Sequence, residues 1–186
     1  MSAGTGLYGF RPLTAADLPM ARRWLATPEV ERWWGDADGQ VSILEEDLEE
    51  GRMAMWVVSH RGRPFAYIQD YDPRAWAMHH LGDLPPGSRG IDQFIGEPDM
   101  LNRGHGSAFI RAHVGWLFAA GAPAVGTDPD PANARALRAY EKAGFAPAGQ
   151  VPDWEGRPVM RMLCRAADLR RAETSRLSAP SGLSRT

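Results

Sequence analysis

Two glycines one residue apart, Gly104 and Gly106, precede a segment with the periodicity of an amphipathic helix. The apolar residues of that segment lie at the spacing of one buried helix face, at Ile110, Val114, Leu117 and Phe118. A Gly-x-Gly turn at the start of a helix leaves unpaired backbone N–H groups pointing outward, with the positive end of the helix dipole behind them. Such a turn binds an anion, and a pyrophosphate fits it best. The sequence therefore predicts a phosphate-binding turn at these glycines.

A second segment, after that helix, carries its own start and stop signals. Asp130 is a good N-cap, Pro131 suits the first helical position, and Gly144 lies where a left-handed residue ends a helix. These residues predict a short helix between two strands. Leu137 and Tyr140 are three residues apart, so they share one face of that helix.

Together the two segments resemble the GCN5-related N-acetyltransferase (GNAT) superfamily, whose members transfer an acetyl group from acetyl-CoA to an amine. In that family the glycine turn holds the CoA pyrophosphate, and a later motif, Asn-x-x-Ala-x-x-x-Tyr-x-Lys-x-Gly-Phe, lies along the pantetheine arm. The residues that match the later motif are Asn133, Ala136, Tyr140, Lys142, Gly144 and Phe145. The usual glycine motif begins with Gln or Arg, where this chain has Leu101. That departure puts little in doubt, because backbone amides hold the phosphates.

A narrower resemblance, to the aminoglycoside 6′-N-acetyltransferases and particularly the type Ib group, covers most of the chain. Residues 89–93 and 126–145 match most closely, and shorter matches lie near the N-terminus and at residues 66–71. We therefore expect acetylation of the 6′-amine of an aminoglycoside antibiotic, which would confer resistance. The siderophore-type N-acyltransferases that act on hydroxylysine share part of this framework and are the chief alternative. A non-catalytic CoA-binding module is a further alternative.

The resemblance also implies where acetyl-CoA binds. In a GNAT fold the strand before the glycine turn splays from the next strand, and the pantetheine fits the gap; here these strands would be residues 92–95 and 125–128. The residues implied in cofactor binding are Gln93, Phe94, Ile95, Arg103, Gly104, His105, Gly106, Ser107, Asn133, Tyr140 and Lys142. We interpret the His105 side chain as a solvated loop residue and not as a catalytic base. No metal is expected.

The amine nucleophile needs a proton acceptor, because an alkylammonium has a pKa of about 10 and must lose its proton before or during attack. Asp92 and Asp128 are the candidates, since each lies at a strand end beside the proposed gap. By resemblance both bind the substrate, and Asp92 is our candidate for a catalytic role. A turn residue before Pro129 is the alternative interpretation of Asp128.

Tyr140 is the second candidate catalytic residue, because it matches the family tyrosine that donates to the departing thiolate. Full proton transfer from a phenol to a thiolate is uphill by about 2 kcal/mol, so a strong hydrogen bond is the expected contribution. The alternative is a core-facing tyrosine with a satisfied hydroxyl. The chain offers no convincing nucleophilic Cys or Ser arrangement, so we expect direct attack on the thioester.

A small polycationic amine substrate needs aromatic walls as well as carboxylates. The candidate wall residues are Trp33, Trp34, Tyr67, Gln69 and Trp76. Tyr67 and Gln69 alternate on one face of a predicted strand, although a buried strand face has the same pattern.

Composition agrees with an enzyme of this kind. A chain of 186 residues with 44% apolar content suits one domain. The single cysteine, Cys164, excludes an internal disulfide framework and is interpreted as a small hydrophobe in a strand. No apolar run approaches the roughly 18 residues of a membrane span, and the first residues lack a secretory apolar region. The net charge of −2 predicts no nucleic-acid footprint. We expect a cytoplasmic monomer or homodimer.

The elements that must position these residues form an α/β pattern. Predicted strands cover residues 8–11, 53–58, 64–71, 90–95, 123–127 and 159–164, and another opens at Phe145. Predicted helices begin after Thr14, at Ser42 with a stop at Gly51, after the glycine turn and after Asp130. The long loop over residues 72–87 is a candidate lid.

The resemblance implies the GNAT fold, with a single mixed, mostly antiparallel sheet flanked by helices and with splayed central parallel strands. We expect one acetyltransferase domain over residues 1–165. The tail over residues 166–186 is rich in Arg, Ala and Ser, which predicts a frayed helix or disorder.

Overall fold

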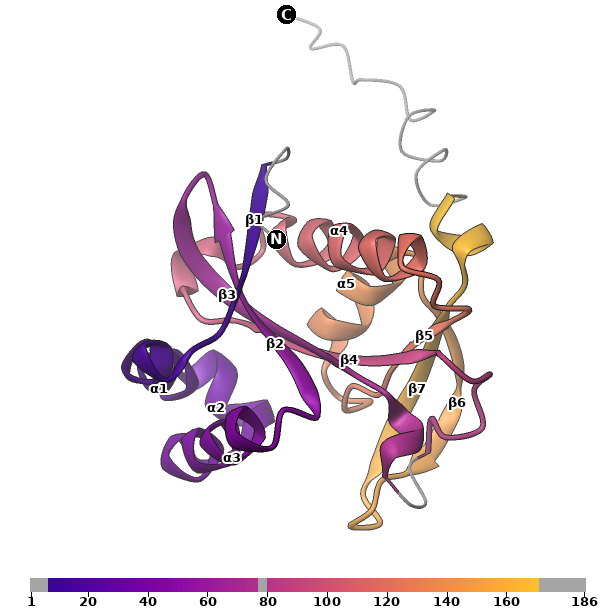
Figure 1. Ribbon diagram of the computed structural model, residues 1–186, viewed down its shortest axis with the longest axis horizontal. Coiled ribbons are helices and arrows are strands. Elements are labelled where there is room, and N and C mark those ends of the chain that lie inside the picture. The colour runs from indigo at the N-terminus through magenta and orange to yellow at the C-terminus, as the bar shows by residue number, and fades with distance from the viewer. Residues whose placement is uncertain (1–6, 77–79, 171–186) are drawn as a thin grey trace, which may run out of the picture.

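The computed structural model describes residues 7–76 and 80–170, which contain one seven-stranded sheet (Figure 1). The strands are β1 (Tyr8–Pro12), β2 (Met53–His60), β3 (Arg63–Tyr71), β4 (Arg89–Ile95), β5 (Val125–Thr127), β6 (Ala146–Pro152) and β7 (Pro158–Cys164). Their order is β1-β2-β3-β4-β5-β7-β6, and only β4 and β5 run parallel. The predicted mixed, mostly antiparallel sheet is confirmed.

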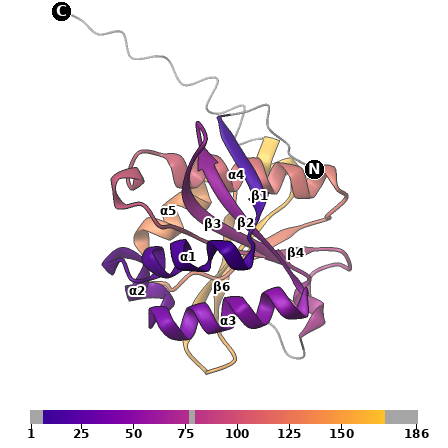
Figure 2. The same ribbon diagram turned by 60° about the vertical axis from the view of Figure 1, so that its left-hand side comes forward.

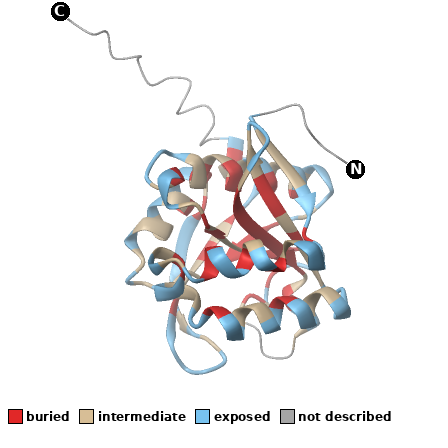
Figure 3. Cartoon of the chain, turned by 90° about the vertical axis from the view of Figure 1, so that its left-hand side faces the viewer, coloured by how far each residue is buried: buried red, intermediate tan, exposed pale blue. Residues whose placement is uncertain are grey.

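Helices cover both faces of this sheet (Figures 1 and 2). They are α1 (Leu18–Leu25), α2 (Pro28–Trp34), α3 (Ala37–Glu50), α4 (His105–Ala119) and α5 (Ala134–Ala143). Successive strand residues point to opposite faces, so Ile68 of β3 joins the core under α4 and α5 while Tyr67 joins the core under α1 and α3. Figure 3 shows the buried strand residues between these two layers. Within the described ranges, the helices are too short or too polar to cross a membrane.

β4 and β5 separate soon after they meet. Their ladder has two residue pairs, Arg89 with Val125 and Gly90 with Gly126. β4 then continues to Ile95 alongside β3, whereas β5 ends at Thr127. The predicted splay of the central parallel strands is therefore present, and it exposes one edge of β4.

The two helix ends that depend on glycine form as predicted. Gly104 is the N-cap of α4 with φ +82°, and Gly144 follows α5 with φ +106°. Both angles lie in the left-handed region that favours glycine. The predicted inner face of α4 is confirmed for Ile110, Val114 and Leu117, which are buried, and Phe118 is partly buried against the same core.

The predicted start of α3 is wrong. Its N-cap is Asp36, whose carboxylate accepts a hydrogen bond from the backbone N–H of Gly39 at 2.8 Å. Ser42 lies inside the helix, where its hydroxyl donates to the carbonyl of Asp38 at 3.2 Å. The predicted stop at Gly51 is correct, with φ +66°.

The predicted start of α5 is also wrong. The Oδ1 atom of Asn133 accepts from the backbone N–H of Ala136 at 3.1 Å, so Asn133 is the N-cap. Asp130 instead accepts from the backbone N–H of Ala132 at 2.7 Å and forms a turn before the helix. Pro131 consequently lies in that turn.

Two further segments differ from expectation. Trp33 and Trp34 belong to α2, a helix that the sequence analysis did not predict. Residues 166–170 of the predicted tail are helical, and Leu169 is buried in the core beside α4. Residues 171–186 of that tail and residues 77–79 of the predicted lid lie outside the described residues.

Candidate active site

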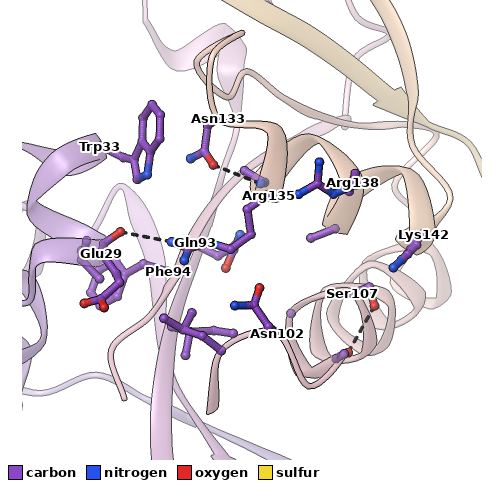
Figure 4. A pocket seen from close by; sticks show the side chains of 17 residues that line it. Glu29, Trp33, Gln93, Phe94, Asn102, Ser107, Asn133, Arg135, Arg138 and Lys142 are labelled. Atoms are coloured by element: carbon purple, nitrogen blue, oxygen red, sulfur yellow. Dashed lines mark hydrogen bonds between the residues drawn. The ribbon is translucent and has the colours of Figure 1, made fainter. Parts of the chain in front are cut away.

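A groove bounded by α2, β4 and α5 runs to the turn before α4 (Figure 4). It includes the edge of β4 that the splay exposes. The predicted cofactor residues that line it are Gln93, Phe94, Ile95, Gly104, Gly106, Ser107, Asn133 and Lys142. Segments far apart in the sequence thus meet where one elongated ligand would contact all of them.

The glycine turn presents backbone donors to this groove. No side chain caps the N-terminus of α4, a helix of 15 residues. The first N–H groups of a helix have no partner within it, and the helix dipole adds positive potential there. A Cβ at Gly106 would lie 3.7 Å from the Ile95 side chain and 3.8 Å from that of Ala139, so β4 and α5 approach the turn closely. The geometry is that of an anion site.

Three cations on α5 face the same groove. Arg135, Arg138 and Lys142 line it, and their spacing puts them on one side of the helix (Figure 4). Nη2 of Arg135 also donates to the backbone carbonyl of Glu29 on α2 at 3.2 Å. The sequence analysis selected Lys142 and missed both arginines, although their helical spacing was a usable signal. Their positive potential favours a ligand rich in phosphate.

Asp92 of β4 accepts hydrogen bonds from two side chains of β3. Nε2 of Gln69 donates to its Oδ2 at 3.0 Å, and the hydroxyl of Tyr71 donates as well. Tyr67 orients Gln69, because its hydroxyl donates to the Gln69 Oε1 at 2.6 Å. Burial and the nearby charge of Asp128 raise the pKa of Asp92 to about 7. A carboxyl group with this pKa is suited to accept a proton near neutral pH.

Asp128 is paired with a histidine that the sequence analysis did not select. Nε2 of His80 lies 2.7 Å from the Asp128 Oδ2, and this contact raises the pKa of His80. Asp128 lies two residues beyond Gly126, and Asp92 lies two residues beyond Gly90. Both carboxylates therefore follow the last paired residues of the splayed strands. No local pattern marks His80, whose position depends on how its loop folds back.

Tyr140 of α5 lies beneath the groove, with 3% of its surface exposed. Its ring packs edge-on against Phe145, with centroids 5.3 Å apart, and its hydroxyl hydrogen-bonds with Thr127 and Gln93. Burial and the charge of Asp92 raise its pKa well above the usual value. The ring thus belongs to the core while the hydroxyl reaches a groove residue.

The predicted aromatic walls lie in different surroundings. Trp33 lines the groove. Trp34 packs edge-on against Tyr67 and Phe94, with centroids 6.2 and 5.0 Å apart, and so belongs to the core. Trp76 packs edge-on against Tyr71 at 5.5 Å, next to Asp92. Tyr67 is fully buried, so it supports Gln69 from beneath and does not form a wall, which corrects the prediction.

Besides Tyr140, two predicted cofactor residues do not line the groove. Arg103 is exposed in the turn. His105 is the first residue of α4 and not a solvated loop residue, because its half-buried ring has Nδ1 2.8 Å from the Tyr8 hydroxyl. Its centroid lies 4.6 Å from that of His60. Burial and the charges of His60 and Arg103 lower the pKa of His105.

A separate polar cluster occupies the other face of the sheet. Asp70 of β3 is 2% exposed and accepts from Nε and Nη2 of Arg89 at 2.9 and 2.6 Å. Nε1 of Trp56 donates to its Oδ2 at 3.0 Å, and Nε2 of His113 on α4 lies 3.1 Å from the same oxygen. The carboxylate is therefore surrounded by partners and sealed by α4.

Cys164 ends β7 and is fully buried. Burial raises the pKa of its thiol to about 12, so the thiolate is not formed near neutral pH. The side chain packs in the core as a small hydrophobe.

With this geometry established, comparison with known proteins decides the family. A family model described as an acetyltransferase (GNAT) domain matches residues 14–152. The chain belongs to this family. The fold of this GNAT acetyltransferase resembles the crystal structure of the aminoglycoside acetyltransferase AAC(6′)-Ib in complex with coenzyme A, with a TM-score of 0.79 and 32% identity. That match covers 89% of this chain and 99% of the other.

Two curated relatives carry related names. An aminoglycoside N(6′)-acetyltransferase type 1 of Klebsiella pneumoniae is 33% identical over 169 residues, which cover 84% of this chain and 83% of that protein. A kanamycin resistance protein of Rhizobium radiobacter is 42% identical over 86 residues, which cover 46% of this chain and 80% of that protein.

Proposed function

We propose that this GNAT acetyltransferase transfers an acetyl group from acetyl-CoA to the 6′-amine of an aminoglycoside in the cytoplasm, and so confers resistance. The observation that carries the proposal is the pair of carboxylates, Asp92 and Asp128, at the open end of the splayed strands. A polycationic amine needs such negative charge, and relatives with aminoglycoside names are about 33% identical to this chain. Most of the chain is covered by those matches.

The groove suits the cofactor along its whole length. Amides of the turn at Gly104 and Gly106 are placed to hold the pyrophosphate, and Arg135, Arg138 and Lys142 supply positive charge for the phosphates. The exposed edge of β4 offers backbone groups to the pantetheine amides. When bound, acetyl-CoA supplies the activated acetyl thioester.

Asp92 is the residue we assign to the amine proton. Its pKa of about 7 lets the carboxylate hold an ammonium and accept a proton from it, directly or through water. Gln69 and Tyr71 fix the carboxylate from β3, so the acceptor is oriented before the substrate arrives. Asp128 binds a second part of the same cation.

Tyr140 lies beside the β4–β5 gap and keeps its proton near neutral pH. Because its pKa is raised, transfer of the phenol proton to a thiolate costs more than in water, and its contribution is a hydrogen bond to the leaving sulfur. Trp33 and Trp76 are assigned to substrate or cofactor contact at the margins of the site, whereas Gln69, which is 8% exposed, acts through Asp92.

A thiol-release assay with acetyl-CoA tests the proposal. Kanamycin, tobramycin and gentamicin are offered beside hydroxylysine and a lysine peptide, and product mass spectrometry locates the acetyl group. We expect turnover with aminoglycosides at the 6′-amine. Turnover with hydroxylysine alone would support the siderophore-type alternative, and CoA binding without turnover of any amine would support a non-catalytic module.

A further inference from the structure

The segment that carries His80 is firmly seated on the sheet. Leu81 and Leu84 are 0% and 5% exposed, and they pack over Gly126 of β5. A Cβ at Gly126 would lie 2.9 Å from a Leu81 methyl group and 3.2 Å from one of Leu84, so glycine is what permits this approach. Asp83 forms an ion pair with Arg161 of β7. The packing on β5 and the ion pair to β7 together hold the segment that begins at His80.

His80 lies beside a cluster of acidic residues, and its contact with Asp128 raises its pKa. The negative groups that face it are Asp128 after β5, Asp92 on β4 and Asp153 in the β6–β7 turn. Asp153 already has a partner, because Nε of Arg157 donates to its Oδ2 at 3.0 Å. The imidazole is therefore matched chiefly with Asp128, at 2.7 Å, and secondarily with Asp92.

Among the described residues, the other titratable groups near Asp128 do not take the place of His80. Tyr71 of β3 and Tyr140 of α5 both interact with Asp92 and Asp128, and burial keeps both phenols neutral. Arg161 is occupied by Asp83. Asp128 is thus paired with protein before any amine arrives.

We propose that His80 is the internal counterion of Asp128, which a substrate ammonium displaces, so that His80 sets the pH range and the charge requirement of amine binding. The inference rests on the proposed function, because it takes Asp128 as a site for a cationic amine. An imidazolium and an ammonium compete for the same carboxylate oxygen, whereas a neutral imidazole competes weakly. When the ammonium takes over Asp128, His80 loses its anionic partner and releases its proton. By linkage, amine affinity then rises as the pH rises through the titration of His80.

Substitution of His80 separates this role from a structural one. H80Q keeps a hydrogen-bond donor for Asp128 and removes the titration, and H80K makes the cation permanent. We expect the KM for kanamycin of H80Q to be several-fold below wild type at about pH 6, where the imidazolium competes with the substrate, and to approach the wild-type KM at about pH 8.5. The ratio between the two enzymes cancels the titration of the amine itself. H80K is expected to raise the KM at both pH values.

D83N is the matched control, since it weakens the same segment at Arg161 without touching Asp128. It is expected to retain the wild-type pH profile. If D83N reproduces the effect of H80Q, loosening of the segment explains the data and the proposal is overturned. A wild-type to H80Q ratio that does not change with pH overturns it as well.

Calorimetry of kanamycin binding in buffers with different ionisation enthalpies provides a readout independent of turnover. Wild type is expected to release a proton near neutral pH that H80Q does not release. Equal proton release by both proteins contradicts the His80 proposal and leaves the proposed function standing. Absence of binding by every amine in the panel overturns both.

Discussion

Asp70 and Asp92 lie one register position apart in this sheet, and their pKa values are shifted in opposite directions. Asp70 pairs across the strands with Ile91, and Asp92 pairs with Gln69, so the two side chains point to opposite faces. Burial alone would raise the pKa of Asp70, but partners that include His113, Trp56 and Arg89 lower it. Asp92 has uncharged donors and a second acid nearby, and its pKa rises to about 7.

The difference teaches how to separate scaffold from site. A buried acid with a full set of cationic and N–H partners holds elements together, here β2, β3, β4 and α4 around Asp70. An acid such as Asp92, which lies beside a second acid and has no cationic partner of its own among its hydrogen-bond donors, is destabilised in its charged form and is suited to bind a cationic ligand. The predictions below test that contrast.

The largest expected effect is on catalysis at Asp92. Asp92→Asn removes the proton acceptor, so we expect kcat/KM for kanamycin to fall about 10²- to 10⁴-fold. Asp128→Asn is expected to act mainly on the KM for the amine. In both variants the KM for acetyl-CoA should change little, which steady-state kinetics with each substrate varied in turn will measure. Equal effects on both KM values would assign these carboxylates to the scaffold.

The second prediction concerns stability at Asp70. Asp70→Asn leaves Arg89 without its carboxylate, so we expect a loss of about 3 kcal/mol in the free energy of unfolding. Urea denaturation measures this loss, and kcat/KM of the folded variant should stay within a few-fold of wild type. A large kinetic defect with unchanged stability would reverse the assignment of the two clusters.

Relative to wild type, the stabilities of Asp70→Asn and Asp92→Asn should depend on pH in opposite ways. The lowered pKa of Asp70 stabilises the fold above its unfolded value of about 3.8, and this is lost as the pH falls through the folded value. The raised pKa of Asp92 means that the folded state holds the proton more tightly between about 3.8 and about 7, so wild-type stability falls as pH rises through that window. Asp92→Asn therefore gains stability relative to wild type above neutral pH, as thermal unfolding across pH will test.

A smaller effect is expected at Tyr140. Tyr140→Phe keeps the ring in the core and removes the hydroxyl, so kcat should fall about 10²-fold with little change in stability. Full activity of the variant would return Tyr140 to a purely structural role.

The smallest effect is expected on the α5 cations. Arg138→Gln should raise the KM for acetyl-CoA about two- to fivefold, and less so at high salt, because exposed charges are screened. Arg22→Gln is the control, since Arg22 pairs with Asp38 away from the groove. Identical behaviour of the two variants would remove Arg138 from the cofactor site.

Local sequence patterns predicted the parts of the site that depend on local geometry. Gly104, Gly106 and Gly144 lie where a positive φ or a close approach is required, and the spacing of Ile110, Val114 and Leu117 defined the face of α4. The prediction that both carboxylates lie at strand ends is correct for Asp128, which follows β5, and wrong for Asp92, which lies inside β4 just beyond the end of its ladder with β5.

What the sequence did not reveal depends on competition and on long-range contacts. Asp130 and Asn133 are both good capping residues, and only the turn that Asp130 forms with Ala132 leaves the cap to Asn133. His80 reaches Asp128 because Leu81 settles against a glycine of β5, a contact between segments 45 residues apart. Such pairings carry no periodicity that a local pattern could detect.

The short ladder between β4 and β5 has a mechanical consequence. Within the sheet that the structure describes, only two residue pairs join strands β1–β4 to strands β5–β7, so backbone pairing between the two halves of the sheet is short. A ligand bound between β4 and β5 would contact both halves of the sheet and could form hydrogen bonds with the unpaired backbone groups of β4. Ligand binding would then stabilise the sheet as a whole. Backbone amides on the exposed edge of β4 between Asp92 and Ile95 would exchange with solvent most slowly when the ligand is bound.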